Sequence, residues 1–291
     1  TPAYLTNKSY FILVSNSLIF AAIVFASSYL KYWPRMQLIA AGMGFMGLAW
    51  PILRMLNHLT MASSIPYADQ YLANWDALIG FDWVAYGQLI EQFPGLAHTM
   101  DRFYSGLTAY SAIAFIAVVL FGRRRDGLSF IEIFLPTALL CTLVGAFFPA
   151  VAAATFYQVD ADAFKLINPY SGAYHLEQMN MLRSGQPVAL NVDKLVGLVT
   201  FPSFHTAMGV IVIWVCRSNA ALFGISFTIN AIMIASTPFF GNHYLIDVIA
   251  GSIVAVVAIA IQSLKSQNAN SDFPPQVTFD EKRKLASDIV T

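Results

Sequence analysis

The amino-acid sequence predicts an all-α fold, a polytopic bundle of about six to seven transmembrane helices with shorter helices at the membrane interface. Hydrophobic residues make up 57% of the 291 residues, charged residues make up only 11%, and the mean hydropathy is +0.62. Soluble domains carry about 25% charged residues, so this chain has less than half of the usual solvating groups. The content of 23 Phe and 13 Tyr excludes a disordered or collagen-like chain. The formal net charge is zero, so the chain lacks the excess of Lys and Arg that nucleic-acid binding needs, and we expect no nucleic-acid partner.

Seven segments are apolar over the roughly 20 residues that cross the hydrocarbon core of a bilayer. They are Tyr10–Leu30, Met36–Leu56, Phe103–Phe121, Leu128–Ala150, Leu195–Trp214, Ala221–Phe240 and Tyr244–Leu264. Pro202 lies inside the fifth of them, and a proline starts a helix more readily than it sits in the middle of one. Cys141 and Cys216 lie in apolar runs and are expected to be small hydrophobic side chains, not a disulfide or a zinc site.

Two long segments are too polar to cross a membrane. Asn57–Arg102 mixes acidic residues with tryptophan and tyrosine, a composition suited to short helices in the membrane interface, where Trp75 and Trp83 would be anchors. Val151–Lys194 is a second polar excursion. We therefore expect a transmembrane domain over residues 1–265.

The last 26 residues, 266–291, carry a Pro-Pro pair and a Glu-Lys-Arg-Lys run, which predicts a disordered tail. Seven spans place most loop Lys and Arg on one side, at residues 31, 35, 123–125, 217 and 265. The positive-inside rule makes that side cytoplasmic, so the tail is cytoplasmic and both polar excursions face outward. The first span has no basic leader and no cleavage site of small residues, so no signal peptide is expected. Short loops favour a bacterial inner membrane over an organellar one.

His205 and His243 stand at the edges of two hydrophobic spans, and the predicted helix order returns both to the outward face. His243 and Asp247 are four residues apart and share one helical face. A carboxylate there can accept the imidazole Nδ1–H, which leaves Nε2 unprotonated and nucleophilic. An acid one turn into an apolar helix is costly and by default a functional candidate. The spacing also fits a plain internal hydrogen bond at the start of a helix.

The segment Pro202-Ser-Phe-His205 has a chemistry of its own. Proline at the first helical position leaves backbone N–H groups free at the positive end of the helix dipole, which attracts anions. Ser203 adds a hydroxyl donor, and His205 can give a proton to a leaving oxygen. Taken alone, the motif fits an ordinary proline-initiated helix with a polar cap at least as well. Two His and one Asp that converge on a helix N-terminus together favour phosphoryl chemistry. The alternative of a haem held by His205 and His243 would give Asp247 no role.

Pro202-Ser-Phe-His205, followed by Ser236-Thr-Pro-Phe-Phe-Gly-Asn-His243-Tyr-Leu-Ile-Asp247, resembles the last two motifs of the type 2 phosphatidate phosphatase superfamily. The branch of inositol phosphorylceramide synthase is the most similar, and sphingomyelin synthases are more distant. The resemblance covers residues 200–251, and upstream it rests on Trp75-Asp-Ala-Leu-Ile-Gly-Phe-Asp82 and Tyr104-Ser-Gly-Leu107.

The resemblance implies a role for each residue of the triad. His243 would attack a lipid phosphate and form a phosphohistidine, and Asp247 would orient it. His205 would protonate the leaving alkoxide and then activate the acceptor hydroxyl. This chemistry needs neither a metal nor another cofactor, because helix N–H groups and cations can stabilise the phosphorane-like charge.

The chain departs from the phosphatase branch in its cations. That branch carries Lys-x6-Arg-Pro before these motifs, and the chain has no Arg-Pro dipeptide. The Ser-Arg pair that precedes the second histidine in that branch is Ser236-Thr237 here. A cation should still face the phosphate, and we favour Arg183 and Lys194, in the stretch leading to Pro202, over Lys165 and Arg102. Each of these side chains also fits a solvated loop.

The sequence therefore predicts an integral-membrane lipid phosphotransferase. It would move a phospho-headgroup from a glycerophospholipid donor to a lipid alcohol, for example a ceramide. The predicted site consists of His243, His205 and Asp247, with Ser203, Arg183 and Lys194 as phosphate-binding residues. Two alternatives stay open, namely a lipid-phosphate or polyprenyl-diphosphate phosphatase and a catalytically silent subunit of a membrane complex. Membrane lipids are the expected partners, and a protein partner is left open.

Overall fold

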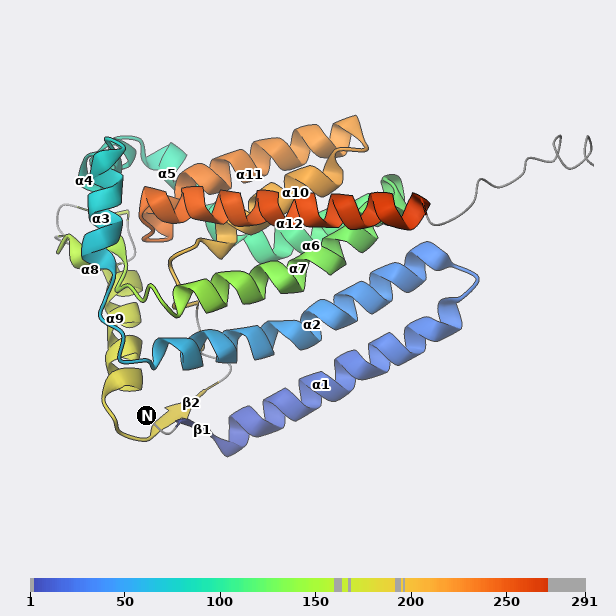
Figure 1. Cartoon of the computed structure of the whole chain (residues 1–291), viewed down its shortest axis with the longest axis horizontal. Coiled ribbons are helices and arrows are strands. Elements are labelled where there is room, and N and C mark those ends of the chain that lie inside the picture. Colours follow the sequence, from blue (N-terminus) through green and yellow to red (C-terminus); the bar gives the residue numbers. More distant parts are fainter. Residues whose placement is uncertain (1–2, 160–163, 167–168, 192–194, 196, 272–291) are drawn as a thin grey trace, which may run out of the picture.

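Long helices run back and forth between the two ends of an elongated bundle in the computed structural model of the chain (Figure 1). The structure describes residues 3–159, 164–166, 169–191, 195 and 197–271. The lengthwise helices are α1 (Asn7–Ser27), α2 (Pro34–Met61), α6 (Leu107–Phe121), α7 (Arg124–Gly145), α10 (Phe204–Cys216), α11 (Ala220–Phe240) and α12 (Leu245–Ser271). The predicted all-α membrane bundle is confirmed.

Five of these helices are long and apolar enough to cross a membrane on their own, namely α1, α2, α7, α11 and α12. A sixth span is the pair of α5 (Pro94–Ser105) and α6, which are bent by 64° at Gly106. The predicted span Leu195–Trp214 is helical only from Phe204, so α10 has 13 residues and is shorter than a full crossing. The described residues before it are irregular, and two of their N–H groups, those of Leu198 and Val199, bind the Asn57 side chain of α2 instead of a helical ladder.

The short elements gather at one end of the bundle, where the chain also begins (Figure 1). They are α3 (Asp69–Leu78), α4 (Trp83–Glu91), α5, α8 (Ala153–Phe156) and α9 (Pro169–Arg183). A 3₁₀ turn (Ser28–Leu30) follows α1 at the opposite end (Figure 1). A parallel pair of β1 (Ala3–Leu5) and β2 (Val188–Leu190) ties the start of the chain to the segment that precedes α10. The described parts of both polar excursions therefore lie at the same end of the bundle.

Polar side chains fix the starts of several helices. The side chains of Thr6, Asp82, Ser203 and Asn219 accept backbone N–H groups from the first turns of α1, α4, α10 and α11. Ser203 is the N-cap of α10 and the helix begins at Phe204, so Pro202 precedes the cap. The expectation that Pro202 is the first helical residue is wrong, because the Ser203 hydroxyl already accepts the N–H of Thr206 at 3.3 Å.

Apolar packing forms one core along the bundle, a second one under the short helices and a third one between the end of α2, α9 and β2. The bundle core joins α2, α6, α7, α10, α11 and α12 and buries Phe115, Phe130 and Ile211. The second core buries Trp83, Phe239 and Tyr244. Trp83 is only 1% exposed, so its expected role as an interface anchor is wrong, whereas Trp75 keeps 37% of its surface.

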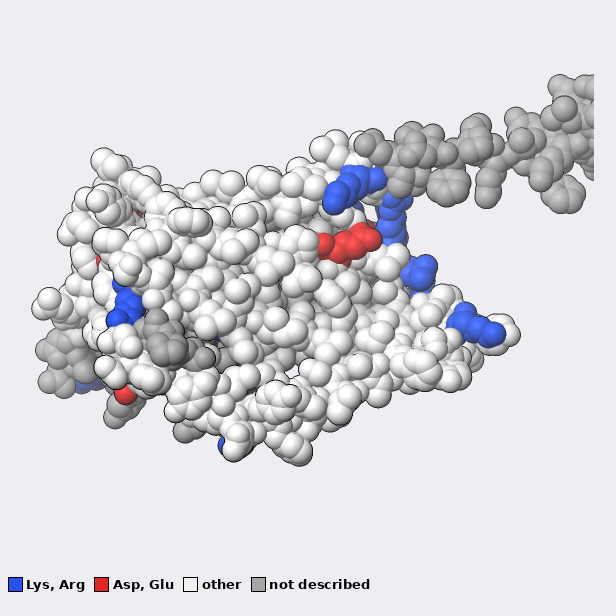
Figure 2. Space-filling view, turned by 60° about the horizontal axis from the view of Figure 1, so that its bottom comes forward, with Lys and Arg blue, Asp and Glu red and all other residues white. Residues whose placement is uncertain are grey.

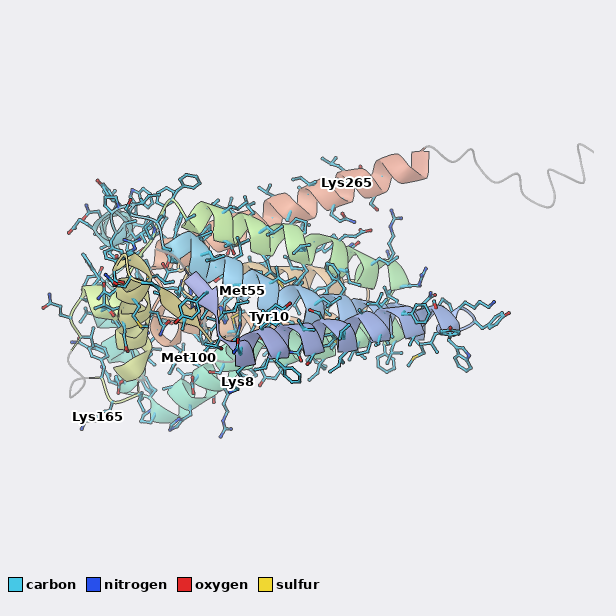
Figure 3. The ribbon with its side chains drawn as sticks, turned by 90° about the horizontal axis from the view of Figure 1, so that it is seen from below. Lys8, Tyr10, Met55, Met100, Lys165 and Lys265 are labelled. Carbon is cyan, nitrogen blue, oxygen red and sulfur yellow. The ribbon has the colours of Figure 1, made fainter. Side chains whose placement is uncertain are left out.

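The opposite end of the bundle is basic. Figure 2 shows several Lys and Arg side chains gathered at the end where α12 finishes. Contacts join this end together, with Arg125 donating to the Ser266 carbonyl at 2.8 Å and Arg217 pairing with Asp126 at 3.3 Å. Lys165 and Lys265 lie at opposite ends of the molecule in Figure 3. The helix order thus separates a basic end from the end that carries both excursions, as the sequence predicts.

The boundary between the bundle and the predicted tail lies beyond Lys265. The helix α12 continues past Lys265 to Ser271, so the first residues of the segment predicted as a tail are helical. Residues 272–291, which make up the rest of the predicted tail, lie outside the described part of the chain.

Candidate active site

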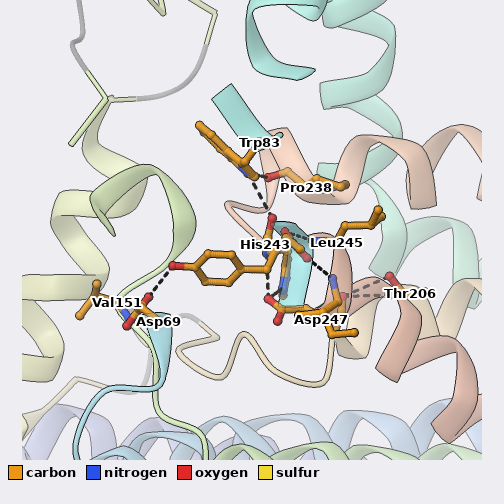
Figure 4. Close-up of polar contacts among 12 residues, drawn as sticks. Asp69, Trp83, Val151, Thr206, Pro238, His243, Leu245 and Asp247 are labelled. Carbon is orange, nitrogen blue, oxygen red and sulfur yellow. Dashed lines mark hydrogen bonds and ion pairs between the residues drawn. The ribbon is translucent and has the colours of Figure 1, made fainter. Parts of the chain in front are cut away.

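His243 and Asp247 form a buried pair at the start of α12 (Figure 4). The Nδ1 atom of His243 lies 3.0 Å from Oδ2 of Asp247, and the same oxygen accepts the N–H of Tyr244 at 3.1 Å. Asp247 has no exposed surface and His243 has 5%. A carboxylate at Nδ1 fixes the tautomer in which Nε2 carries the free lone pair. This is the arrangement that the four-residue spacing predicts.

A sharp turn between α11 and α12 carries His243. Asn242, immediately before it, has φ of +54°, a left-handed conformation that Asn adopts more easily than most residues. The Asn242 carbonyl accepts the N–H of Ala153 at 3.0 Å, which attaches the turn to α8. A Cβ atom on Gly241 would lie 2.6 Å from the Tyr104 hydroxyl and 2.7 Å from Cδ2 of His243. The turn is therefore held tightly from both sides.

His205 lies on the second residue of α10, next to His243. The His243 ring is close enough to act electrostatically on His205. Tyr104 from α5 stacks on the His205 ring, with 4.5 Å between ring centroids and 15° between ring planes. Since the Tyr104 hydroxyl also flanks Gly241, one tyrosine contacts both histidine segments. The structure thus brings together the three residues predicted as the catalytic triad.

Ser203 joins the starts of α10 and α12. Its backbone N–H donates to the carbonyl of Asp247 at 3.0 Å, and its hydroxyl lies 3.2 Å from the Thr206 hydroxyl. A Cβ atom on Gly251 would lie 2.3 Å from the Ser203 carbonyl oxygen, so glycine lets the two helices approach this closely. The Ser203 hydroxyl, predicted to bind phosphate, is engaged in capping α10.

Two acids of α3 hold the first turn of α12 from outside. Asp76 accepts the N–H of Leu245 and that of Ile246, each at 2.8 Å, and so caps α12 with a side chain from another helix. Asp69 accepts the Tyr244 hydroxyl at 2.9 Å and the N–H of Val151 (Figure 4).

Trp83 of α4 holds the turn before α12. Its indole N–H lies 2.9 Å from the Pro238 carbonyl and 3.1 Å from that of His243, so it bridges the end of α11 and the turn that carries His243 (Figure 4). The short helices of the first polar excursion therefore build the support of the His243 segment.

Burial sets the protonation of this region. Burial lowers the pKa of His243 to about 4, and a hydrogen bond with the Thr200 backbone opposes this shift in part. The ring is therefore neutral at physiological pH, as a nucleophile requires. Burial also raises the pKa of Asp76 to about 6, a shift that the N–H donors of Leu245 and Ile246 reduce and the Asp247 charge increases.

The predicted phosphate-binding cations are placed differently. The guanidinium of Arg183 donates to the carbonyls of Met61 and Ile65 at 3.2 and 3.0 Å and lies 4.2 Å from the Tyr67 ring centroid. Arg183 therefore holds the end of α2. Lys194 falls outside the described residues.

A cation that the sequence reasoning missed, Arg54 of α2, acts electrostatically on His205. Its Nη1 atom donates to the Leu195 carbonyl at 2.6 Å. Three residues further along α2, the Asn57 side chain accepts the N–H of Leu198 at 2.7 Å. These two contacts fix the irregular segment that leads to His205. Arg54 was hidden in a predicted span, where an ionisable residue is itself a signal of function.

The arrangement has the chemical groups that nucleophilic phosphoryl transfer requires. It contains a neutral imidazole oriented by a buried carboxylate, a second histidine beside it for proton transfer, and a nearby guanidinium that can neutralise phosphate charge. Among the described residues, no three His, Cys, Asp or Glu side chains are grouped so that they could hold a metal ion.

Comparison with known proteins yields one finding. The family model described as the PAP2 superfamily, whose members are phosphatases and phosphotransferases, matches residues 70–261. This range begins at α3 and ends within α12, so it contains all of the site except Asp69 and the contributions of α2. No curated protein and no solved structure matches the chain.

Proposed function

Because the chain belongs to the PAP2 superfamily, we propose that it is an integral-membrane lipid phosphotransferase that works through a phosphohistidine on His243. The donor is a glycerophospholipid, the acceptor is a lipid alcohol such as a ceramide, and diacylglycerol is the first product. The observation that carries this proposal is the 3.0 Å contact between Nδ1 of His243 and the fully buried Asp247. It supports Nε2 as the nucleophile.

The reaction has two displacements at phosphorus. In the first, Nε2 of His243 attacks, a P–N bond forms, and the P–O bond to diacylglycerol breaks while His205 gives its proton to the leaving alkoxide. In the second, His205 takes the proton of the acceptor hydroxyl, whose oxygen attacks phosphorus while the P–N bond breaks. Asp247 stabilises the positive charge on the His243 ring in between. His205 acts as an acid and then as a base, so it has to be protonated before the first displacement and neutral before the second; Tyr104 stacks on its ring and holds it in place.

The runner-up function is a lipid-phosphate phosphatase in which water replaces the acceptor alcohol. The absence of an Arg-Pro dipeptide and the Ser236-Thr237 sequence, where the phosphatase branch has Ser-Arg, favour the transferase. Phosphate or a free phospho-headgroup released at the same rate without an acceptor lipid would favour the phosphatase.

We also propose that the site faces the outside of the cell, in a bacterial inner membrane. The basic residues lie at the end of the bundle opposite to His243, and the positive-inside rule assigns a basic end to the cytoplasm (Figure 2).

The test is diacylglycerol release from mixed phospholipids by the purified protein, with and without ceramide. We expect His243→Ala to lower the rate by roughly three orders of magnitude or more, since it removes the nucleophile. Asp247→Asn should lower it by about 10² to 10⁴ and leave residual activity through a misoriented imidazole. His98→Ala, at an exposed position of α5, is the control and should keep the wild-type rate.

Release that depends on both His243 and a lipid alcohol supports the transferase. Wild-type rates in the His243 or Asp247 variants would refute the mechanism. A wild-type protein that releases nothing from any mixture would favour the silent subunit.

A further inference from the structure

Arg54 places a permanent positive charge within a helix that is apolar enough to cross the membrane. It belongs to α2 (Pro34–Met61), one of the five helices that qualify as spans on their own. Guanidinium groups stay protonated under all ordinary conditions, and a charge within an apolar helix is costly unless it has a partner, a function or access to the interface. Arg54 is half-buried, and its neighbour Met55 marks this part of α2 in Figure 3.

The guanidinium has protein contacts for only part of its donors. Nη1 donates to the Leu195 carbonyl, and the group lies 4.9 Å from the Trp50 ring centroid. A guanidinium has five N–H donors in a rigid fork. In the described part of the chain the ion pairs are Arg217 with Asp126 and His243 with Asp247, so Arg54 has no carboxylate partner there. Its charge is available to an anion from outside the protein.

Arg54 lies against the stretch of chain that borders both histidines. It binds the Leu195 carbonyl, and one turn further along α2 Asn57 binds the N–H of Val199. The next residue, Thr200, contacts the His243 ring through its backbone, and the segment then leads into α10 and His205.

Arg183 is differently engaged, although it too lies near α2. Two of its nitrogens donate to the carbonyls of Met61 and Ile65, and its face covers the Tyr67 ring. Its donors are thus directed to the backbone at the end of α2 and not toward the histidines.

We propose that Arg54 binds the phosphate of the lipid substrate and neutralises its charge while His243 attacks. This inference rests on the proposed function for the identity of the substrate. A planar fork can hold two phosphate oxygens at once, which a lysine cannot do. The phosphatase branch has an arginine where this chain has Thr237, and Arg54 would supply the positive charge that is missing there.

The experiment measures binding of inorganic phosphate to the purified full chain by calorimetry, apart from any lipid turnover. We expect Arg54→Gln to weaken phosphate binding at least about tenfold, because a charge-assisted contact is lost. Arg54→Lys keeps the charge and a donor for Leu195 but loses the fork, so it should lie between wild type and Arg54→Gln. Arg35→Gln, at the basic end of the bundle, is the matched control and should bind phosphate like wild type.

A second control separates phosphate binding from support of the backbone. Asn57 fixes the same irregular segment through the N–H groups of Leu198 and Val199, yet it carries no charge. Asn57→Ala should therefore leave phosphate affinity within about threefold of wild type if Arg54 acts through its charge. Equal losses in Asn57→Ala and Arg54→Gln would mean that Arg54 only positions the segment, and would overturn the proposal.

Kinetics on the lipid substrate distinguish the two proposals. If wild type releases diacylglycerol in a His243-dependent manner while Arg54→Gln has unchanged KM and kcat, the result supports the proposed function and contradicts the role of Arg54. If wild type releases no diacylglycerol but binds phosphate through Arg54, the result supports the anion site and contradicts the proposed reaction. Size-exclusion profiles and thermal unfolding verify that each variant is folded.

If Arg54→Gln misfolds, the phosphate affinity of Arg54→Lys tests the proposal instead. An Arg54→Lys protein with wild-type phosphate affinity would then overturn the proposal.

Discussion

Asp76 links its own protonation to the geometry of the His243–Asp247 pair. Its carboxylate accepts the N–H groups of Leu245 and Ile246, and these residues begin the turn that contains Asp247. Burial raises the pKa of Asp76 from its ordinary value of 3.8 to about 6. A carboxylate can accept both N–H groups, whereas a protonated carboxyl turns one of its oxygens into a donor. The cap is therefore complete only above about pH 6.

We predict two acidic steps in the pH profile of kcat/KM. As the pH falls through about 6, protonation of Asp76 loosens the start of α12 and the rate decreases. As it falls further through about 4, protonation of His243 removes the nucleophile. In Asp76→Asn the amide has one acceptor oxygen at every pH, so the upper step should vanish, the rate should stay reduced, and the lower step should remain. An upper step that persists in Asp76→Asn would assign it to another group.

Residues within one helical turn could be predicted from the sequence, and residues that act across helices could not. The spacing of His243 and Asp247 is local, so it was enough to predict their contact. Asp76 and Tyr104 lie in the two upstream stretches that resemble the superfamily, but their roles depend on contacts with α12 and α10. Arg54 is far in sequence from both histidines. It comes near the site only because α2 packs against the segment before α10.

At the scale of elements, the contact between α10 and α12 depends on Gly251. We predict that Gly251→Ala displaces the start of α10, because the new Cβ would lie 2.3 Å from the Ser203 carbonyl oxygen, which is backbone and cannot rotate away. The backbone N–H of Ser203 donates to the Asp247 carbonyl, and Ser203 lies two residues before His205. A displaced Ser203 would therefore shift His205, and kcat should fall about tenfold or more, the loss that a misplacement of about 1 Å can cause. The measurement is the turnover of the purified variant.

Gly224→Ala in α11 is the matched control for this substitution. A Cβ atom there would meet nothing within 4 Å, so the variant should keep its turnover and gain roughly 0.5–1 kcal/mol of helix stability. A Gly251→Ala protein as active as Gly224→Ala would show that the two helix starts tolerate separation.

The apolar runs predicted the long helices well, and the exceptions have local causes. The bundle helices follow from runs long enough to span a bilayer. Helix α10 starts nine residues after the predicted start at Leu195, because Asn57 takes the N–H groups of Leu198 and Val199 and Ser203 provides the cap. The bend of 64° between α5 and α6 divides a polar helix from an apolar one, and hydropathy alone does not encode its angle.

For the whole molecule, the separation of a basic end from the site end predicts which face of the membrane the site occupies. Ser184, after α9, is exposed at the end that carries both excursions, and Tyr32, between α1 and α2, is 81% exposed at the other. A membrane-impermeant thiol reagent applied outside intact cells should label Ser184→Cys and leave Tyr32→Cys unlabelled. The native Cys141 and Cys216 are buried and provide a silent background. The reverse labelling pattern would place the site on the cytoplasmic face.

The shortness of α10 has a consequence for the membrane around the protein. Gly251, which contacts Ser203 at the start of α10, lies six residues into α12, so α10 begins about 9 Å along that helix from its first residue. We predict that local thinning of the bilayer brings a lipid phosphate down to this level, which would make hydrophobic mismatch part of substrate entry. Turnover in reconstituted bilayers should therefore decrease as the acyl chains of the host lipid lengthen, with His243→Ala as the blank. A rate independent of bilayer thickness would mean that the substrate descends into the protein without deforming the membrane.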